Sequence, residues 1–205
     1  MKAVTRRAAL AGAAAMAVAT NAHAGLPASL RAHPGYRAWT APHPGAVIPM
    51  AARVETGSGT ISLEQFLGRR PAVLALWASW CAPCLMEKPH QAFLARRLAA
   101  AGASAQLFAM QVYDDADVTL SDARWMLDQI GANALPLARA TAPAEAQFRR
   151  LLGADTPSST RLPAVLLISA DGLELGRAFG MMRGADGRSD YWQDEATFDF
   201  LSRLV

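Results

Sequence analysis

The two cysteines of the chain are the residues best suited to chemistry, and they lie three positions apart in Cys81-Ala82-Pro83-Cys84. An apolar, β-favouring run over 71–77 gives way here to a helical pattern, so Cys81 is expected at the N-terminus of a helix. The unpaired N–H groups and partial positive charge of a helix N-terminus favour a thiolate over a thiol. We therefore expect Cys81 to have a lowered pKa and to act as a nucleophile. Cys84, one helical turn later, is placed to resolve the mixed disulfide that Cys81 forms with a partner.

Three other interpretations of the cysteine pair are weaker. A zinc site needs four ligands, and the chain has no second cysteine pair and no closely spaced histidines. A purely structural disulfide is disfavoured, because a bridge between such close residues constrains the unfolded chain little. Two inert core cysteines remain an alternative, against which the helix-start position and the intervening Pro83 argue. The pattern therefore favours redox chemistry.

Composition indicates a globular chain with little net charge. Of the 205 residues, 52% are hydrophobic and 18% are charged, which suits one domain with a substantial core. The net charge of +3 is accounted for by Lys2, Arg6 and Arg7 alone. The rest of the chain is electrically balanced, so we expect no binding to nucleic acid.

Residues 1–24 have the pattern of an export signal. A cationic start is followed by an apolar run over 8–19 and by Ala22-His23-Ala24, which fits a cleavage site before Gly25. The run is too short to span a bilayer stably, and Thr5 to Leu10 loosely resembles a twin-arginine signal. No later stretch is long and apolar enough for a membrane span. We therefore expect signal removal at this site and location in the periplasm, an oxidising compartment where disulfides persist.

After the signal, the sequence predicts a Pro/Ala-rich extended arm over 25–50 and one folded domain over 51–205. The expected elements are a hairpin within 53–61, a helix over 63–67, a strand over 73–77, a helix from the cysteine motif to about 101, a strand over 106–112, a helix over 118–130, a short strand over 135–138, a helix over 143–152, strands over 164–169 and 173–179, and a helix over 195–204. This order predicts an α/β sandwich with a mixed central sheet and helices on both faces, ending in a β-hairpin and a C-terminal helix.

The residues around the cysteines resemble the thioredoxin fold. Trp77-Ala78-Ser79-Trp80 precedes the pair, Pro89 follows Cys84 by five residues, and Leu162-Pro163 precedes the late hairpin. Cys81 and Cys84 then correspond to the nucleophilic and the resolving thiol. The fold also implies a cis peptide bond before Pro163, which would set the Leu162 backbone against the cysteine pair, where it could hydrogen-bond a substrate strand.

Three further features narrow the resemblance to the TlpA/ResA/DsbE-like periplasmic thiol–disulfide oxidoreductases. They are the export signal, the acidic residue Glu87 after the motif, and the sequence over 63–71 that leads into the strand before the motif. The resemblance covers about 51–205 and is looser over 118–161. We expect the substrate contacts to come from residues that flank the cysteines and from the residue before the proline: Trp80, Ala82, Pro83 and Leu162. For Trp80, an apolar platform for the partner and a packing role are both open.

Glu87 is the candidate acid–base residue. It follows Cys84 by three positions, so the two share a helix face. If Glu87 is buried there, its pKa rises, and it can take or give a proton as Cys84 changes between thiol and thiolate. Cytosolic thioredoxins instead keep a buried aspartate in the preceding strand, where this chain has Ala75. The alternative is a solvated glutamate beside Lys88.

The resemblance implies exchange of disulfides with periplasmic proteins through the Cys81–Cys84 disulfide, without another cofactor or a metal. In the favoured direction the dithiol reduces its partner, and a membrane thiol reductase supplies the electrons. Implied substrates are the haem-binding cysteines of apo-cytochrome c or a copper-site protein. A disulfide oxidase or isomerase is an alternative, because direction depends on reduction potential. A copper-handling module is another, with Met86, Met181 and Met182 as candidate ligands, although methionines more often fill core gaps. A thiol peroxidase fits poorly with a cysteine pair.

Overall fold

The computed structural model describes residues 26–42, 46–153, 161–188 and 190–205. The predicted export signal over 1–24 and its cleavage site therefore lie outside the described residues. Within the described ranges, no helix is long and apolar enough to cross a membrane.

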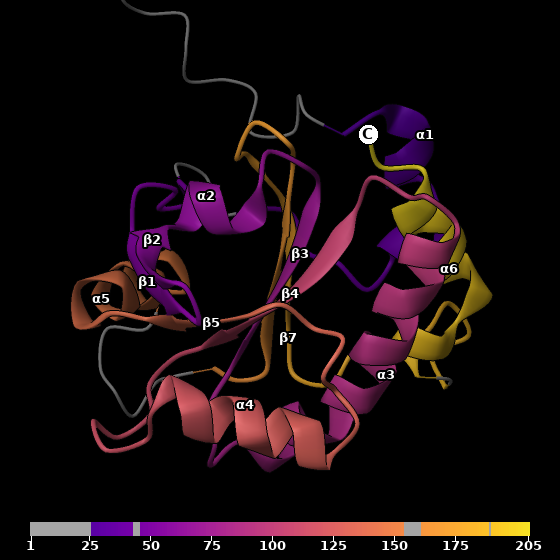
Figure 1. The fold of residues 1–205 in the computed structure, drawn as a ribbon. Coiled ribbons are helices and arrows are strands. Elements are labelled where there is room, and N and C mark those ends of the chain that lie inside the picture. Colours follow the sequence, from indigo (N-terminus) through magenta and orange to yellow (C-terminus); the bar gives the residue numbers. More distant parts are fainter. Residues whose placement is uncertain (1–25, 43–45, 154–160, 189) are drawn as a thin grey trace, which may run out of the picture.

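Seven strands form one mixed sheet in the order β2-β1-β5-β4-β3-β6-β7 (Figure 1). The strands are β1 (Arg53–Thr56), β2 (Gly59–Ser62), β3 (Ala72–Trp77), β4 (Gln106–Gln111), β5 (Leu137–Ala140), β6 (Ala164–Ile168) and β7 (Glu174–Phe179). The pairs β3/β4 and β4/β5 are parallel, because helical crossovers connect these strands. The other pairs are antiparallel, and short turns join β1 to β2 and β6 to β7.

Strand β3 positions the cysteine motif. All six of its residues are buried, as the unbroken apolar run predicts for a strand covered on both faces. It lies between β4 and β6, so its backbone is hydrogen-bonded along both edges. The chain leaves β3 at Trp77 and reaches Cys81 four residues later, which fixes the motif at the end of the most enclosed part of the sheet.

Helices cover both faces of the sheet (Figure 1). They are α1 (Ala28–Arg31), η1 (Pro34–Tyr36), α2 (Leu63–Leu67), α3 (Ala82–Ala100), α4 (Leu120–Gln129), α5 (Ala142–Leu151), η3 (Tyr191–Gln193) and α6 (Glu195–Ser202). Helices α3, α4 and α6 supply apolar side chains to the core on one face, and α2 and α5 supply the core on the other. This three-layer α/β sandwich, with its final hairpin and C-terminal helix, confirms the predicted fold class.

Local sequence signals account for several helix boundaries. Ser62 and Gln65 form a capping box at the start of α2, and Gly68 ends that helix in the left-handed conformation with φ of 72°. Helix α4 begins two residues later than predicted, because Thr119 and Asp122 form a second capping box that the pattern of apolar residues does not reveal.

The predicted arm is not extended throughout. Its residues 26–42 contain α1 and η1 and pack against the domain. Gly35 of η1 lies so close to α6 that a Cβ there would collide with the carbonyl oxygen of Ala196. Thr40 pairs with Arg177 of β7 through backbone hydrogen bonds of 2.8 and 3.0 Å. The segment therefore adds contacts to both α6 and the sheet edge.

Candidate active site

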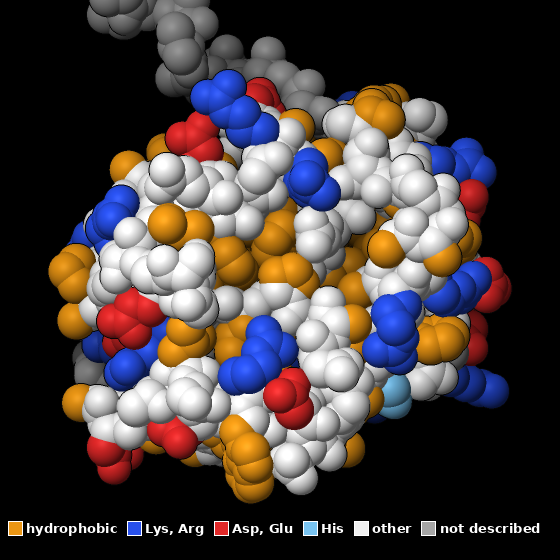
Figure 2. Space-filling model, in the orientation of Figure 1, with side chains coloured by type: hydrophobic (Ala, Val, Ile, Leu, Met, Phe, Trp, Pro, Cys, Tyr) orange, Lys and Arg blue, Asp and Glu red, His pale blue; other side chains and the backbone are white. Residues whose placement is uncertain are grey.

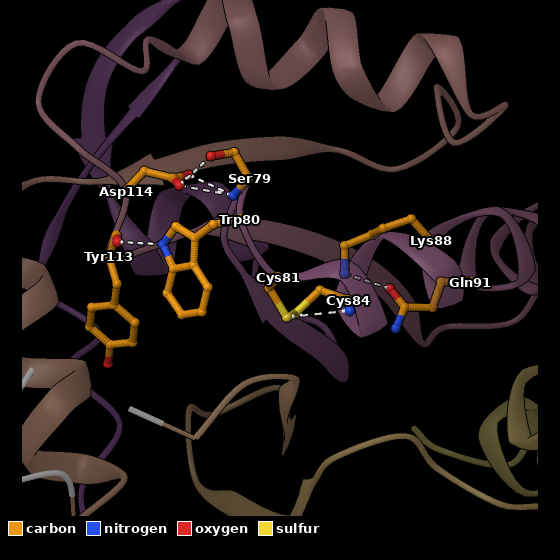
Figure 3. The surroundings of a disulfide bond; sticks show 8 residues. All are labelled: Ser79, Trp80, Cys81, Cys84, Lys88, Gln91, Tyr113 and Asp114. Atoms are coloured by element: carbon orange, nitrogen blue, oxygen red, sulfur yellow. Dashed lines mark hydrogen bonds between the residues drawn. A yellow bond between two sulfur atoms is a disulfide. The ribbon is translucent and has the colours of Figure 1, made fainter. Parts of the chain in front are cut away.

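Cys81 and Cys84 are joined by a disulfide at the N-terminus of α3 (Figure 3). Their Cα atoms lie 5.2 Å apart. Cys81 is the N-cap residue, and its Sγ accepts a hydrogen bond of 3.3 Å from the backbone N–H of Cys84. Pro83 lies in the first turn, where its missing N–H leaves no helical bond unmade. The geometry places a hydrogen-bond donor and the positive end of a helix at the first sulfur, as the sequence predicts.

The two cysteines differ slightly in exposure. Cys84 is fully enclosed, whereas Cys81 keeps 3% of its surface exposed. Cys81 is therefore the more accessible of the two, although a partner must approach closely to reach it.

The predicted substrate contacts all keep some exposed surface. Trp80 is 58% exposed and Ala82 is exposed, whereas Pro83 and Leu162 are half-buried. Two further apolar side chains are open to solvent, Met86 on α3 and Met181 after β7. Trp80 is open to solvent, and its role as an apolar platform for the partner stays a prediction.

The loop after β4 hydrogen-bonds the two residues that precede Cys81, Ser79 and Trp80, and the sequence did not predict this role. The Asp114 carboxylate accepts hydrogen bonds from the Ser79 backbone N–H (2.9 Å) and hydroxyl (2.6 Å), and from Gln111 Nε2 (2.8 Å). Trp80 Nε1 donates to the carbonyl oxygen of Tyr113 at 3.0 Å (Figure 3). A signal was present, because the residues that follow two adjacent parallel strands meet at one edge of a sheet.

Glu87 is buried, with 1% of its surface exposed, which excludes the alternative of a solvated helix residue. Its Oε1 accepts a hydrogen bond of 3.0 Å from the backbone N–H of Met182, and its Oε2 has no hydrogen-bond partner among the described residues. Burial raises the pKa of the Glu87 carboxyl. The Met182 N–H, the nearby Trp192 indole and Lys88 oppose this rise in the pKa, and Asp190 adds to it. No hydrogen bond of normal geometry joins the Trp192 indole Nε1 to Oε2.

Lys88 is also buried, with 1% of its surface exposed, and the sequence did not predict this. Figure 3 shows its side chain running back along α3 toward the cysteine pair. Its Nζ donates to Gln91 Oε1 at 3.0 Å and lies 5.9 Å from the centre of the Trp77 ring. Burial lowers the pKa of Lys88 to about 7, against an opposing effect of Glu87. Glu87 and Lys88 therefore follow Cys84 by three and four residues, and burial raises the pKa of the first and lowers the pKa of the second.

The Leu162–Pro163 peptide bond is cis, as the resemblance implies. Ala164, the first residue of β6, pairs with Leu76 of β3 in an antiparallel register. This register puts Pro163 beside the end of β3, where the chain turns toward the cysteines. The carbonyl oxygen of Pro163 accepts a hydrogen bond of 2.8 Å from Gly180, which ties the same point to the end of β7.

Among the residues that the structure describes, no three His, Cys, Asp or Glu side chains are grouped so that they could hold a metal ion. The methionines weighed as copper ligands differ in exposure: Met86 and Met181 are open to solvent, and Met182 is buried.

No protein-family model and no curated protein sequence matches this chain. Solved structures do match it. A protein from Aquifex aeolicus described as an electron transfer protein superposes with a TM-score of 0.55 at 16% identity, over 78% of this chain and 94% of that one. A thiol:disulfide interchange protein of the DsbE type from Chlorobium tepidum gives 0.51 at 24% identity, over 70% and 89%. A thioredoxin-family interchange protein from the same organism gives 0.50 at 20% identity, over 75% and 97%.

These similarities define the class of the protein by its fold. The chain has the thioredoxin fold, with a Cys-x-x-Cys disulfide at the start of α3 and a cis-proline at the start of β6. The resemblance stated from the sequence is confirmed at the level of the fold.

Proposed function

We propose that this protein is a thiol–disulfide oxidoreductase that reduces disulfides of protein partners through Cys81 and Cys84. The observation that carries the proposal is the disulfide at the helix N-terminus, in which the first sulfur receives a backbone N–H and the second is enclosed. A helix N-terminus stabilises the negative charge of a thiolate, so reduction of the pair leaves Cys81 as the nucleophile.

The reaction balances over two exchange steps. The Cys81 thiolate attacks one sulfur of the partner disulfide, which forms a mixed disulfide and releases the other partner sulfur as a thiolate. Cys84 then loses its proton, and its thiolate attacks the Cys81 sulfur. This second attack forms the Cys81–Cys84 bond and releases the second partner thiolate. Two electrons pass to the partner, and a thiol reductant must return two to the pair before the next cycle.

Glu87 is proposed as the group that takes and returns the Cys84 proton. Cys84 is fully buried, so water has no direct access to its thiol. Glu87 shares its helix face, is buried itself, and has one carboxylate oxygen without a hydrogen-bond partner among the described residues. A raised carboxyl pKa brings the proton affinity of Glu87 closer to that of a thiol, which favours transfer between them.

The partner is proposed to dock as an extended strand beside the motif. Trp80, Ala82 and Pro83 would contact it on the helix side, and the Leu162 backbone would hydrogen-bond it beside cis-Pro163. All four keep exposed or half-exposed surface. The chain outside residues 1–24 carries no net charge, and basic and acidic side chains are interspersed over the face drawn in Figure 2; neither feature favours nucleic acid as the partner.

The cellular setting is proposed from the sequence. An export signal over 1–24 would place the protein in the periplasm, with the segment over 25–50 retained on the domain over 51–205. A membrane thiol reductase would then recharge the pair, without a further cofactor. The resemblance favours the haem-binding cysteines of apo-cytochrome c, or the cysteines of a copper site, as substrates.

Reduction of insulin disulfides by dithiothreitol tests the activity. Wild-type protein should accelerate it, and both Cys81→Ser and Cys84→Ser should lose the acceleration. Cys84→Ser should in addition trap a partner as a mixed disulfide through Cys81, whereas Cys81→Ser should not. Stoichiometric Cu(I) binding without any insulin reduction would refute the proposal and support the copper-handling alternative instead.

A further inference from the structure

The segment 26–42 takes no part in the proposed chemistry, yet two of its residues, Trp39 and Gly35, contact η3. Trp39 Nε1 donates a hydrogen bond of 2.6 Å to the Tyr191 hydroxyl, which in turn donates one of 2.8 Å to the carbonyl oxygen of Gly35. The Trp39 and Tyr191 rings also meet edge to face, with centroids 6.1 Å apart. Because Tyr191 is buried, loss of these partners would leave a polar hydroxyl poorly satisfied inside the protein.

Tyr191 is connected in turn to Glu87. Its backbone N–H donates to the carbonyl oxygen of Met182 at 3.4 Å, and the N–H of the same methionine donates to Glu87 Oε1 at 3.0 Å. A continuous series of contacts therefore runs from Trp39 through Tyr191 and Met182 to the carboxylate.

A second connection passes through the neighbour of Tyr191. The Trp192 ring packs edge to face on Tyr191, with centroids 5.1 Å apart. The nearby Trp192 indole opposes the rise in the pKa of the Glu87 carboxyl. Trp192 is itself fully buried. Helix η3 contacts α3, so Trp192 is part of the buried surroundings of Glu87.

The charged groups that face Glu87 come from two elements. Lys88 lies next to it on α3, and Asp190 lies at the start of η3. Asp190 accepts a hydrogen bond of 2.8 Å from the Trp192 backbone N–H, which ties it to η3, and it pairs with His90 Nδ1 at 2.7 Å, which ties it to α3. Displacement of η3 would therefore act on Glu87 chiefly through hydration, while the His90 pair holds the Asp190 charge near α3.

We propose that the segment 26–42 is a positioning element for Glu87, with Trp39 and Tyr191 as the positioning residues. This inference rests on the proposed function, because it assigns the segment to the acid–base step of that reaction. Its consequence is specific. Burial is the largest cause of the raised Glu87 pKa, so loosening η3 admits water and moves that pKa down, toward the ordinary glutamate value.

The test compares two arm residues that each donate one hydrogen bond to the domain. Trp39→Phe keeps an aromatic ring but removes the donor to Tyr191. Tyr36→Phe is the matched control, because the Tyr36 hydroxyl donates a hydrogen bond of 2.7 Å to the carbonyl oxygen of Leu175 on β7, away from η3. The reduced protein reacts with a small chromogenic disulfide, which needs no docking surface. The measurement is the pH dependence of the second chromophore release, the step in which Cys84 resolves the mixed disulfide. Glu87→Gln identifies the inflection that belongs to Glu87.

We expect Trp39→Phe to move the Glu87 inflection to lower pH by at least about half a pH unit, and Tyr36→Phe to leave it in place. Tyr191→Phe should act like Trp39→Phe, and it serves as the second variant if Trp39→Phe does not fold. An unshifted inflection in folded Trp39→Phe or Tyr191→Phe overturns the positioning role while the Glu87 chemistry stands. A profile that Glu87→Gln leaves unchanged overturns both, and insulin reduction by the two cysteines then survives as a separate result.

Discussion

The burial of Lys88 next to the redox motif predicts how the free energy of unfolding depends on pH. Burial lowers the pKa of Lys88 from 10.5 to about 7. At about 1.4 kcal/mol for each pH unit between the two pKa values, keeping the charged ammonium inside costs about 5 kcal/mol. The unfolded lysine holds its proton up to pH 10.5, and the folded one releases it near 7. The stability of the protein therefore rises with pH between these values, and the full cost applies below pH 7.

Lys88→Met removes this cost and fills similar volume. It also leaves Gln91 Oε1 without its donor, a loss of about 1–3 kcal/mol. We therefore expect the oxidised variant to be more stable than wild type by about 2–4 kcal/mol at pH 6, with the gain falling as the pH rises and giving way to a small loss near pH 10, where only the lost hydrogen bond remains. Urea unfolding of both proteins from pH 6 to 10 measures the difference, in which the titrations of groups that Lys88 does not influence cancel; Glu87, which it does influence, is controlled by repeating the comparison in a Glu87→Gln background.

Arg96→Met is the matched control, since Arg96 is an exposed cation on the same helix. Its stability difference from wild type should stay small and flat with pH. Lys88 is the only lysine besides Lys2, so isotope-labelled lysine followed by NMR reports its pKa directly. Loss of stability in Lys88→Met at pH 6, or a lysine pKa near 10.5, would refute the argument that burial dominates at this site.

Two further predictions concern the active site. Glu87→Gln should slow disulfide exchange near neutral pH severalfold while changing the free energy of unfolding little, because the amide keeps the Met182 hydrogen bond but cannot accept the Cys84 proton; equal rates for Glu87→Gln and wild type in stopped-flow assays would remove Glu87 from the mechanism. Asp114→Ala should cost about 1–3 kcal/mol of stability in urea unfolding, because Ser79 and Gln111 lose their acceptor, and it should slow insulin reduction. Unchanged stability would show that the loop after β4 does not hold the motif.

Much of the fold could be predicted because its signals are local. The apolar run of β3 and the capping box at Ser62 each report on their own neighbourhood in the chain. The cysteine motif could be recognised for the same reason, because both cysteines and the start of the helix lie within four residues of the chain. The cis bond before Pro163 was predicted only through the family resemblance, because a proline by itself seldom implies a cis bond.

What the sequence did not reveal depends on contacts between distant segments. Asp114 holds Ser79 across 35 positions, and this pairing follows from the register of β3 and β4 rather than from either segment. Trp39 reaches Tyr191 across 152 positions. The burial of Lys88 was missed for another reason. Lysines are rarely buried, and this one is enclosed where α3 lies against Trp77, with its Nζ 5.9 Å from the centre of the ring.

The equilibrium of the Cys81–Cys84 pair with defined ratios of reduced and oxidised glutathione or dithiothreitol tests the central claim most directly. The proposed reductase requires a single two-electron transition at a reducing potential, at or below about −220 mV. A transition near −120 mV would instead indicate a disulfide donor, and the absence of any exchange would contradict the account of these two cysteines as a redox pair.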